Sequence, residues 1–273
     1  MLTIVIVSYK SAEVLLKCQR ELLSKGRYPV IVVDNASPDH SADRIAEAFP
    51  QVAVERLPRN IGYGGGANAG IRLAKTPYVL LLNPDLEATA EEIDALLAIA
   101  QNAGNEAAIY APATRRKDQR DAPPQPAEWV LGAAMLFNVE AMREVGWFDE
   151  QYFLFYEEKD LCLRTLKAGK RILYCPSLCF PHLKGKSSPD SAAIDHLKQW
   201  HVGWSSQRYF QKHGLATGKR RPWRMLLQYG FRALTASSAE KRRKYRARVE
   251  GVWAFMQGQA ATQDNGQPRG LIR

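Results

Sequence analysis

The stretch that decides the fold is Val79-Leu80-Leu81-Leu82-Asn83-Pro84-Asp85-Leu86. An unbroken apolar run that ends in a turn is typical of a strand buried on both faces, as in a parallel sheet. Pro84 lacks a backbone donor and ends the strand. Asp85 is therefore expected at the carboxyl end of a central strand, the edge at which open α/β sheets bind ligands. The same residues also fit an ordinary Asx turn before the next helix.

Two more apolar runs of this kind precede that stretch. Residues 2–7 lead into Ser8-Tyr9-Lys10-Ser11, and residues 30–33 lead into Asp34-Asn35-Ala36-Ser37. Helices are expected over about 12–24 and 41–49, with a third strand over 52–57. Strands and helices that alternate at this spacing predict a parallel sheet with right-handed crossovers. Asp34 and Asp85 should then share one edge of the sheet.

The segment Asn60-Ile61-Gly62-Tyr63-Gly64-Gly65-Gly66 is rich in glycine and precedes a helix that is expected to end near residue 75. Glycines let a backbone approach another group closely, and a helix N-terminus suits an anion. The segment has neither the dinucleotide-binding fingerprint nor the P-loop lysine, so it supports neither of those sites. A flexible turn is the simpler alternative.

The remaining elements are expected in the second half of the chain. Strands are predicted over 108–112, 128–137, 171–174 and 177–180, with a loop over 114–126. Helices are predicted over 90–102, 140–145, from about 157 to 169, and over 192–212, 223–234 and 239–257.

A cluster of acids stands where the helix near residue 157 begins. Glu157, Glu158 and Asp160 follow an aromatic segment, residues 152–156, in which four of five residues are Phe or Tyr. An aromatic wall could desolvate one of these carboxylates and raise its pKa towards that of a general base. Acids at a helix N-terminus are also ordinary dipole stabilisers, and the residues alone leave both interpretations open.

The segment from His182 to residue 188 is the last candidate for a site. Beside Asp85, His182 could complete a divalent-cation site, although a lone histidine is more often structural. The side chains of this segment that could hold a diphosphate are Lys184, Lys186, Ser187 and Ser188.

The charge of the chain is concentrated near its C-terminus. Residues 201–273 hold 15 Lys and Arg against 3 Asp and Glu, out of totals of 38 and 28, so the rest carries a slight excess of acid. A basic segment of this kind can bind nucleic acid or anionic lipid, or can simply be solvated. There is no apolar run long enough to span a membrane. The four cysteines form no CxxC pair, which favours reduced thiols in a cytoplasmic protein.

In this order the motifs resemble the inverting family 2 glycosyltransferases with a GT-A fold, most of all the bacterial rhamnosyltransferase-type branch. The resemblance covers roughly residues 2–190 and rests on the segments above together with Phe148-Asp149-Glu150. It implies a mostly parallel α/β sheet flanked by helices, with residues 1–190 as the nucleotide-sugar-binding and catalytic domain. Residues 191–258 would form a helical basic extension, and 259–273 a disordered tail.

The resemblance also assigns roles by position. The residues it places on the nucleotide-sugar donor are Ser8, Tyr9, Asp34, Asn35, Asn60, Gly62, Gly64, Asn83, Lys184 and Ser187. Asp85 and His182 would bind Mg²⁺ or Mn²⁺. Glu158 stands where an aspartate base is usual, with Glu157 and Asp160 as the alternative bases.

The function implied is inverting transfer of a sugar from a dTDP- or UDP-sugar to a saccharide or lipid-linked acceptor in bacterial surface-polysaccharide synthesis. The branch favours dTDP-rhamnose. The enzyme is expected in the cytoplasm or on the inner face of its membrane, held to anionic lipid by the basic helices. A metal-dependent nucleotidyltransferase would want glycine within Ser8–Ser11, which has none. A nucleic-acid-binding protein is the non-enzymatic alternative, but no nucleic-acid motif supports it, and no nucleic acid is expected as a partner.

Overall fold

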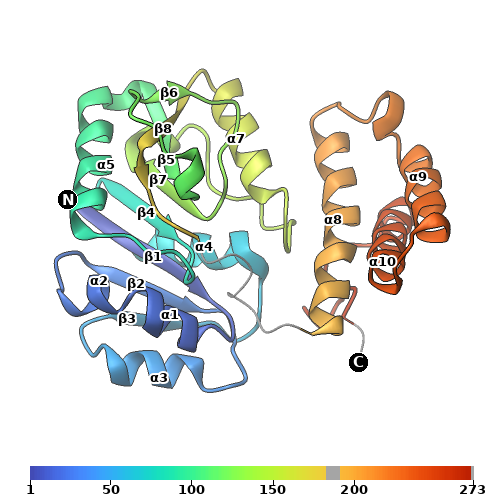
Figure 1. Cartoon of the computed structure of the whole chain (residues 1–273), viewed down its shortest axis with the longest axis horizontal. Helices are drawn as coiled ribbons and strands as arrows, with labels where there is room; N and C mark the ends of the chain where they lie inside the picture. Colours follow the sequence, from blue (N-terminus) through green and yellow to red (C-terminus); the bar gives the residue numbers. More distant parts are fainter. Residues whose placement is uncertain (183–190, 272–273) are drawn as a thin grey trace. The chain divides into compact units, whose positions relative to one another are not determined.

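A computed structural model describes residues 1–182 and 191–271 of the chain. The chain divides into two compact units (Figure 1). The first comprises Met1–Asn60, Gly65–Phe148 and the described residues from Glu158 to His182, and the second comprises Ile61–Gly64, Asp149–Glu157 and the described residues from Ser191 onward. The domain boundaries expected from the sequence stay a prediction.

The first unit is built on a mixed sheet with the strand order β3-β2-β1-β4-β7-β5-β8-β6. Its strands are β1 (Leu2–Ser8), β2 (Val30–Asp34), β3 (Ala53–Arg56), β4 (Tyr78–Leu82), β5 (Ala107–Ala113), β6 (Gln125–Pro126), β7 (Ala134–Asn138) and β8 (Arg171–Cys179). The first four in this order are parallel, β7 is antiparallel to both its neighbours, and β5 runs parallel to β8. Consequently β1, β2, β4, β5 and β8 all end at the same edge.

Helices cover both faces of this sheet. The helices of the first unit are α1 (Ala12–Cys18), α2 (Arg20–Ser24), α3 (Ser41–Ala48), most of α4 (Gly62–Leu73), α5 (Ala90–Ala103), α6 (Val139–Met142) and nearly all of α7 (Glu157–Lys167). The largest core cluster joins α1, α2, α3 and α5 to one face, where the side chains of Ile4, Ile6 and Leu80 point. Val5 and Val33 point to the other face, because successive side chains alternate along a strand.

Glycines let α4 lie directly on that second face. A Cβ added to Gly70 would lie 2.4 Å from Cγ1 of Val5 and 2.9 Å from Cγ2 of Val33. One added to Gly66 would lie 2.9 Å from Cγ1 of Val7. The segment Gly62–Gly66, expected as a loop, is already helical, and Gly66 and Gly70 serve the packing of α4 on the sheet. The predicted contact of Gly62 and Gly64 with a donor stays a prediction.

The second unit is a three-helix bundle of α8 (Ala192–Lys212), α9 (Pro222–Thr235) and α10 (Ala239–Met256) (Figure 1). Backbones approach closely where α8 and α10 meet, because a Cβ on Gly251 would lie 2.0 Å from the carbonyl oxygen of Trp200. Trp200 and Trp204 bury against Phe153 and Ala254, while Val252 packs on α9. None of the helices in residues 1–182 and 191–271 is long and apolar enough to cross a bilayer.

The predicted class, a mostly parallel α/β sheet flanked by helices with a helical C-terminal segment, is confirmed. Three local predictions were wrong. The helix over 12–24 is broken at Gln19, whose buried side chain donates to the carbonyl oxygen of Leu86. The strand expected over 128–137 is limited to β7, which begins at Ala134. The two short strands expected over 171–180 form one strand, β8, whose pairing with β5 shifts register between Pro112 and Ala113. The predicted loop over 114–126 includes a short 3-10 turn, Arg116–Asp118, and β6.

Candidate active site at the carboxyl edge of the sheet

The loops that follow β1 and β2 are tied together by backbone hydrogen bonds. Ser8 pairs with Asp34 in the sheet register, and the Asn35 N–H donates to the Ser8 carbonyl oxygen at 2.8 Å. The Lys10 N–H donates to Ser37 Oγ at 2.9 Å, and the Ser37 N–H donates to Asp34 Oδ2 at 3.0 Å. Asp34 is therefore held rigidly at the edge, buried to 4% exposure.

Two of these loop residues adopt the left-handed conformation that favours glycine. Lys10 has φ 53° and Ala36 has φ 60°. Such values are uncommon outside glycine and persist where surrounding contacts fix the backbone, often at functional sites. The other oxygen of Asp34, Oδ1, is buried and has no hydrogen-bond partner among the described residues. The edge thus presents a carboxylate oxygen that can accept a bond from a ligand hydroxyl.

Asp85 and His182 meet at the same edge although 97 residues separate them in the sequence. Asp85 is fully buried, and its Oδ1 lies 3.0 Å from Nε2 of His182, whose side chain is 19% exposed. Backbone pairing fixes both residues, because Leu86 bridges to His182 and the His182 N–H donates to the Thr114 carbonyl oxygen at 3.0 Å. The strands β4 and β8 point the same way, so the residues after them converge.

The second oxygen of this carboxylate is not satisfied by the protein. Asp85 Oδ2 and the nearby Asn83 Oδ1 are both buried, and neither has a hydrogen-bond partner within residues 1–182 and 191–271. A buried anionic oxygen without a partner carries a large desolvation cost, which a bound cation would offset. The described part of the chain contains no group of three or more His, Cys, Asp or Glu placed to hold a metal. The Asp85–His182 pair could supply only part of a coordination sphere.

The three acids at the start of α7 occupy different environments. Asp160 is fully buried and its Oδ2 accepts a hydrogen bond from Nε of Arg164 at 2.8 Å. The same guanidinium donates to the carbonyl oxygens of Val145 and Trp147. Arg164 therefore ties the helix to the preceding loop, and Asp160 orients its guanidinium. Glu158 is half-buried in the first unit, whereas Glu157, 5% exposed, belongs to the second.

The aromatic segment before α7 packs on α8 within the second unit. Phe153 stacks on His201 with ring centroids 4.9 Å apart, and Tyr156 lies 5.5 Å from Tyr209. The expectation that the aromatic rings desolvate one of the three carboxylates stays a prediction. Tyr156 and the preceding Phe155 have φ of 70° and 66°, so the backbone entering α7 is strained at two consecutive bulky residues.

The other predicted donor residues are distributed as follows. Tyr9 and Asn60 are half-buried in the first unit, and Gly62 and Gly64 belong to the second. Gly62 has φ 81°, and a Cβ there would lie 2.2 Å from the Phe153 carbonyl oxygen, so only glycine fits. Lys184 and Ser187 lie outside the described residues.

A hollow of about 410 Å³ opens beside His182 in the first unit. Its lining includes Thr114, Val130, Leu131, Tyr174 and the indole of Trp129, which is 51% exposed. Nζ of Lys159 lies 5.0 Å from the centre of that indole. The prediction of a strand over 128–137 gave Trp129 no role, although a large aromatic residue stands three positions before Gly132.

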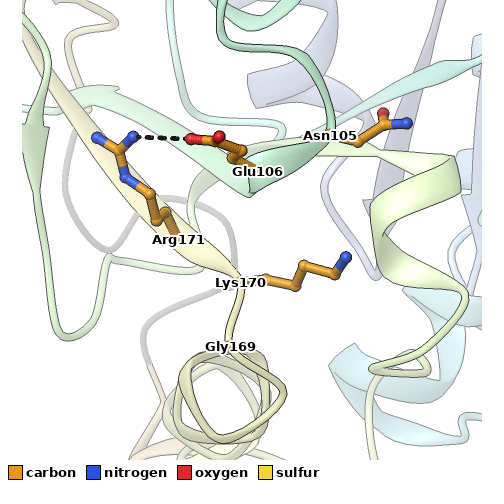
Figure 2. Close-up of a pocket in the computed structure, with 5 residues that line it drawn as sticks. All are labelled: Asn105, Glu106, Gly169, Lys170 and Arg171. Carbon is orange, nitrogen blue, oxygen red and sulfur yellow. Dashed lines mark ion pairs between the residues drawn. The ribbon is translucent and has the colours of Figure 1, made fainter.

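A second hollow, of about 440 Å³, lies at the opposite edge of the sheet, where β5 and β8 begin. Figure 2 shows Glu106 and Arg171 facing each other across it, joined by an ion pair of 3.6 Å. Lys170 extends from the turn between α7 and β8. None of the predicted site residues lines this hollow, so it is separate from the candidate active site.

The four cysteines, all within the described residues, form no disulfide in this structure. Burial raises the pKa of the Cys162 and Cys175 thiols to about 12. Both thiols are therefore protonated at neutral pH and act as small apolar core residues.

Comparison with known proteins identifies the type of domain. The family model for glycosyl transferase family 2 matches residues 3–171. An N-acetylglucosaminyl-diphospho-decaprenol L-rhamnosyltransferase of Mycobacterium tuberculosis is 27% identical over 224 aligned residues, which cover 63% of this chain and 73% of that protein.

Two solved structures share the fold at low identity. TarS of S. aureus, residues 1–349 in complex with UDP-GlcNAc, superposes with a TM-score of 0.57 at 12% identity, covering 94% of this chain and 92% of that one. The mannosyltransferase PcManGT of Pyrobaculum calidifontis, in complex with GDP-Man and Mn²⁺, gives 0.61 at 14% identity, covering 94% and 86%. The predicted GT-A type of sheet is thereby confirmed.

Proposed function

The chain belongs to glycosyl transferase family 2, and we propose that it transfers a rhamnosyl group from dTDP-rhamnose, with inversion, to a hydroxyl of a lipid-linked saccharide. Family membership makes it a glycosyltransferase and not a nucleotidyltransferase. The choice of rhamnose is supported by the rhamnosyltransferase relative, whose name also specifies a polyprenol-linked substrate. UDP-sugars are the alternative donors.

The observation that carries the proposal is the pair Asp85–His182 at the edge that also holds Asp34. Asp34 Oδ1 and Asp85 Oδ2 are buried carboxylate oxygens without partners in the described chain. Asp34 suits the hydroxyls of a ribose, and Ser8 and Asn35 lie beside it in the sheet register and the following loop. A nucleoside diphosphate laid along this edge would run from Asp34 to Asp85.

The residues present fit a divalent cation, either Mg²⁺ or Mn²⁺. Asp85 would hold it through the unpartnered Oδ2, with His182 as a nitrogen ligand, and oxygen-rich donor sets of this kind suit both ions. When bound, the ion would offset the negative charge that develops on the departing diphosphate. The protein alone offers so few ligands that metal should bind weakly until the donor diphosphate adds its own oxygens.

Glu158 is the proposed base. Its carboxylate takes the proton of the acceptor hydroxyl while that oxygen bonds to the anomeric carbon. The bond between this carbon and the diphosphate oxygen breaks on the opposite face. Asp160 is already engaged by Arg164 and orients its guanidinium, and Glu157 is almost completely buried. The hollow beside His182, with the exposed face of Trp129, is suited to stacking on a sugar ring.

The test is turnover of dTDP-rhamnose and UDP-sugars by the full chain, with Mg²⁺ or Mn²⁺, followed by the anomeric configuration of the product. Asp85→Asn and Glu158→Gln are each expected to lower turnover about 100-fold or more. Glu87→Gln is the matched control, because Glu87 is exposed and lies two residues from Asp85. Retention of near wild-type turnover in both site variants, or a retained anomeric configuration, would contradict the mechanism.

A further inference from the structure

Helix α9 has apolar side chains on two opposite sides. On one side Met225 and Tyr229 are buried with Val252 of α10, and Ala233 follows one turn later. This spacing of four residues marks a single helical face, and its burial accounts for how α9 is held in the bundle. A helix held in this way normally presents polar residues on its remaining surface.

The opposite side of α9 is also apolar, but it is exposed. Trp223, Leu227, Phe231 and Leu234 are spaced by four, four and three residues, which places them along one face. Their exposed fractions are 47%, 66%, 67% and 83%. Four large apolar side chains in one exposed row exceed the scattered apolar residues that an ordinary protein surface carries. We therefore expect the exposed row to be covered by a binding partner.

The charges around the exposed row identify that partner as anionic. α9 contains no acidic residue, and the guanidinium of Arg224 lies 5.0 Å from the ring of Trp223. Arg221 precedes the helix and is exposed, whereas Arg220 and Arg232 lie against the rings of Phe210 and Tyr245 within the bundle. On α10, residues 241–244 are four consecutive exposed Lys and Arg. A second copy of this chain would bring like charges together, which disfavours self-association through this surface.

We propose that the exposed row of α9 docks on an anionic lipid bilayer, with the helix lying in the plane of the interface. The apolar side chains would enter the boundary between headgroups and acyl chains, while Arg221 and Arg224 extend to the lipid phosphates. An indole at one end of the row suits that boundary. A lipid-linked acceptor requires that the enzyme contact the membrane, and the exposed row would be the surface that does so. The inference therefore rests on the proposed function.

The test is sedimentation of the full chain with vesicles of phosphatidylcholine, with and without phosphatidylglycerol. Wild type is expected to pellet with the anionic vesicles and to be released by salt only in part, because the apolar contact is not screened. The double variant Leu227→Gln, Phe231→Gln should bind about tenfold more weakly or worse, since each side chain withdrawn from lipid removes apolar burial. Leu73→Gln, at a 46% exposed leucine of α4, is the matched control and should bind like wild type.

Each other outcome would overturn the proposal. Equal pelleting of wild type and the double variant would mean that the row does not enter lipid. Failure of wild type to pellet, or equal binding to neutral vesicles, would exclude an anionic bilayer as the partner. A wild-type dimer that becomes monomeric in the double variant, measured by light scattering without lipid, would make the row a protein interface. Sugar-nucleotide turnover with a soluble acceptor is measured separately, so failure of the proposed function would be visible even if vesicle binding persists.

Discussion

Replacing Gly70 by alanine should destabilise the protein although alanine favours helices. The added methyl group would lie 2.4 Å from Cγ1 of Val5 and 2.9 Å from Cγ2 of Val33, inside the 3.4–4 Å of ordinary contact. Overpacking of a rigid core lowers the free energy of unfolding by about 1–3 kcal/mol, whereas exchange of glycine for alanine within a helix raises it by about 1 kcal/mol. The expected net loss is about 1 kcal/mol.

The chain contains a matched control for this substitution. Gly230 also lies inside a helix, α9, but a Cβ there would meet nothing within 4 Å. Gly230→Ala should therefore stabilise by about 0.5–1 kcal/mol, because only the backbone effect remains. The two identical exchanges should thus differ in sign, by about 2 kcal/mol in total.

The measurement is urea unfolding followed by circular dichroism, with each variant compared with wild type. Val5→Ala removes the nearest clashing methyl group, so Gly70→Ala should cost less in that background, with a favourable coupling of about 1 kcal/mol. Donor affinity is a second readout, because displacement of α4 from β1 and β2 would move the strand ends that carry Asp34. The reasoning would be refuted if Gly70→Ala stabilised the protein as much as Gly230→Ala does.

Three further predictions concern buried charges. Burial alone would raise the pKa of Asp149, but hydrogen bonds from Lys212, the backbone and Arg208 outweigh it and lower the pKa from 3.8 to about 2. Because the pKa of Asp149 is lower in the folded state than in the unfolded state, the ionised carboxylate stabilises the fold. Asp149→Asn should therefore cost about 1–2 kcal/mol at neutral pH after solvent screening. In urea unfolding, the difference in stability between this variant and wild type should shrink as pH falls from about 4 towards 2. Arg164→Ala should cost about 3 kcal/mol, measured as a lower melting temperature, because it removes the cation beside the fully buried carboxylate of Asp160. Asp160→Asn in that background should recover part of the loss. Mn²⁺ should raise the melting temperature clearly only when a nucleoside diphosphate is also present, and Asp85→Ala should abolish that increment; an equal metal effect without nucleotide would contradict the weak-site argument.

Some of the fold and site could be predicted because local patterns determine them. The apolar runs of β1, β2 and β4 are buried on both faces, and each stops at a turn residue, so their strand character and direction follow from the residues alone. Parallel strands end at a common edge, so the sequence alone predicts that Asp34 and Asp85 share it. His182 was a candidate ligand by its residue type, and the family resemblance strengthened that role. The family model matches residues 3–171 and so does not cover it.

Other features were decided only by tertiary structure, because local periodicity does not say which surface a side chain will meet. The glycines of α4 predict close approach in general, but only the packed helix shows that Gly70 approaches Val5 and Val33. The aromatic residues before α7 predict burial in general, but only the packed unit shows that Phe153 stacks on His201 of α8.

The difference between what the sequence determines and what the tertiary structure decides is clearest at Asp85. The sequence by itself determined that a carboxylate stands at the end of a buried strand, since an apolar run followed by Asn-Pro-Asp has few other outcomes. Only the tertiary structure decided that one carboxylate oxygen meets His182, 97 residues later, and that the other is buried without a partner in the described chain. Strand order and the placement of β7 between β4 and β5 bring the two residues together, and such long-range order depends on the packing of the whole sheet.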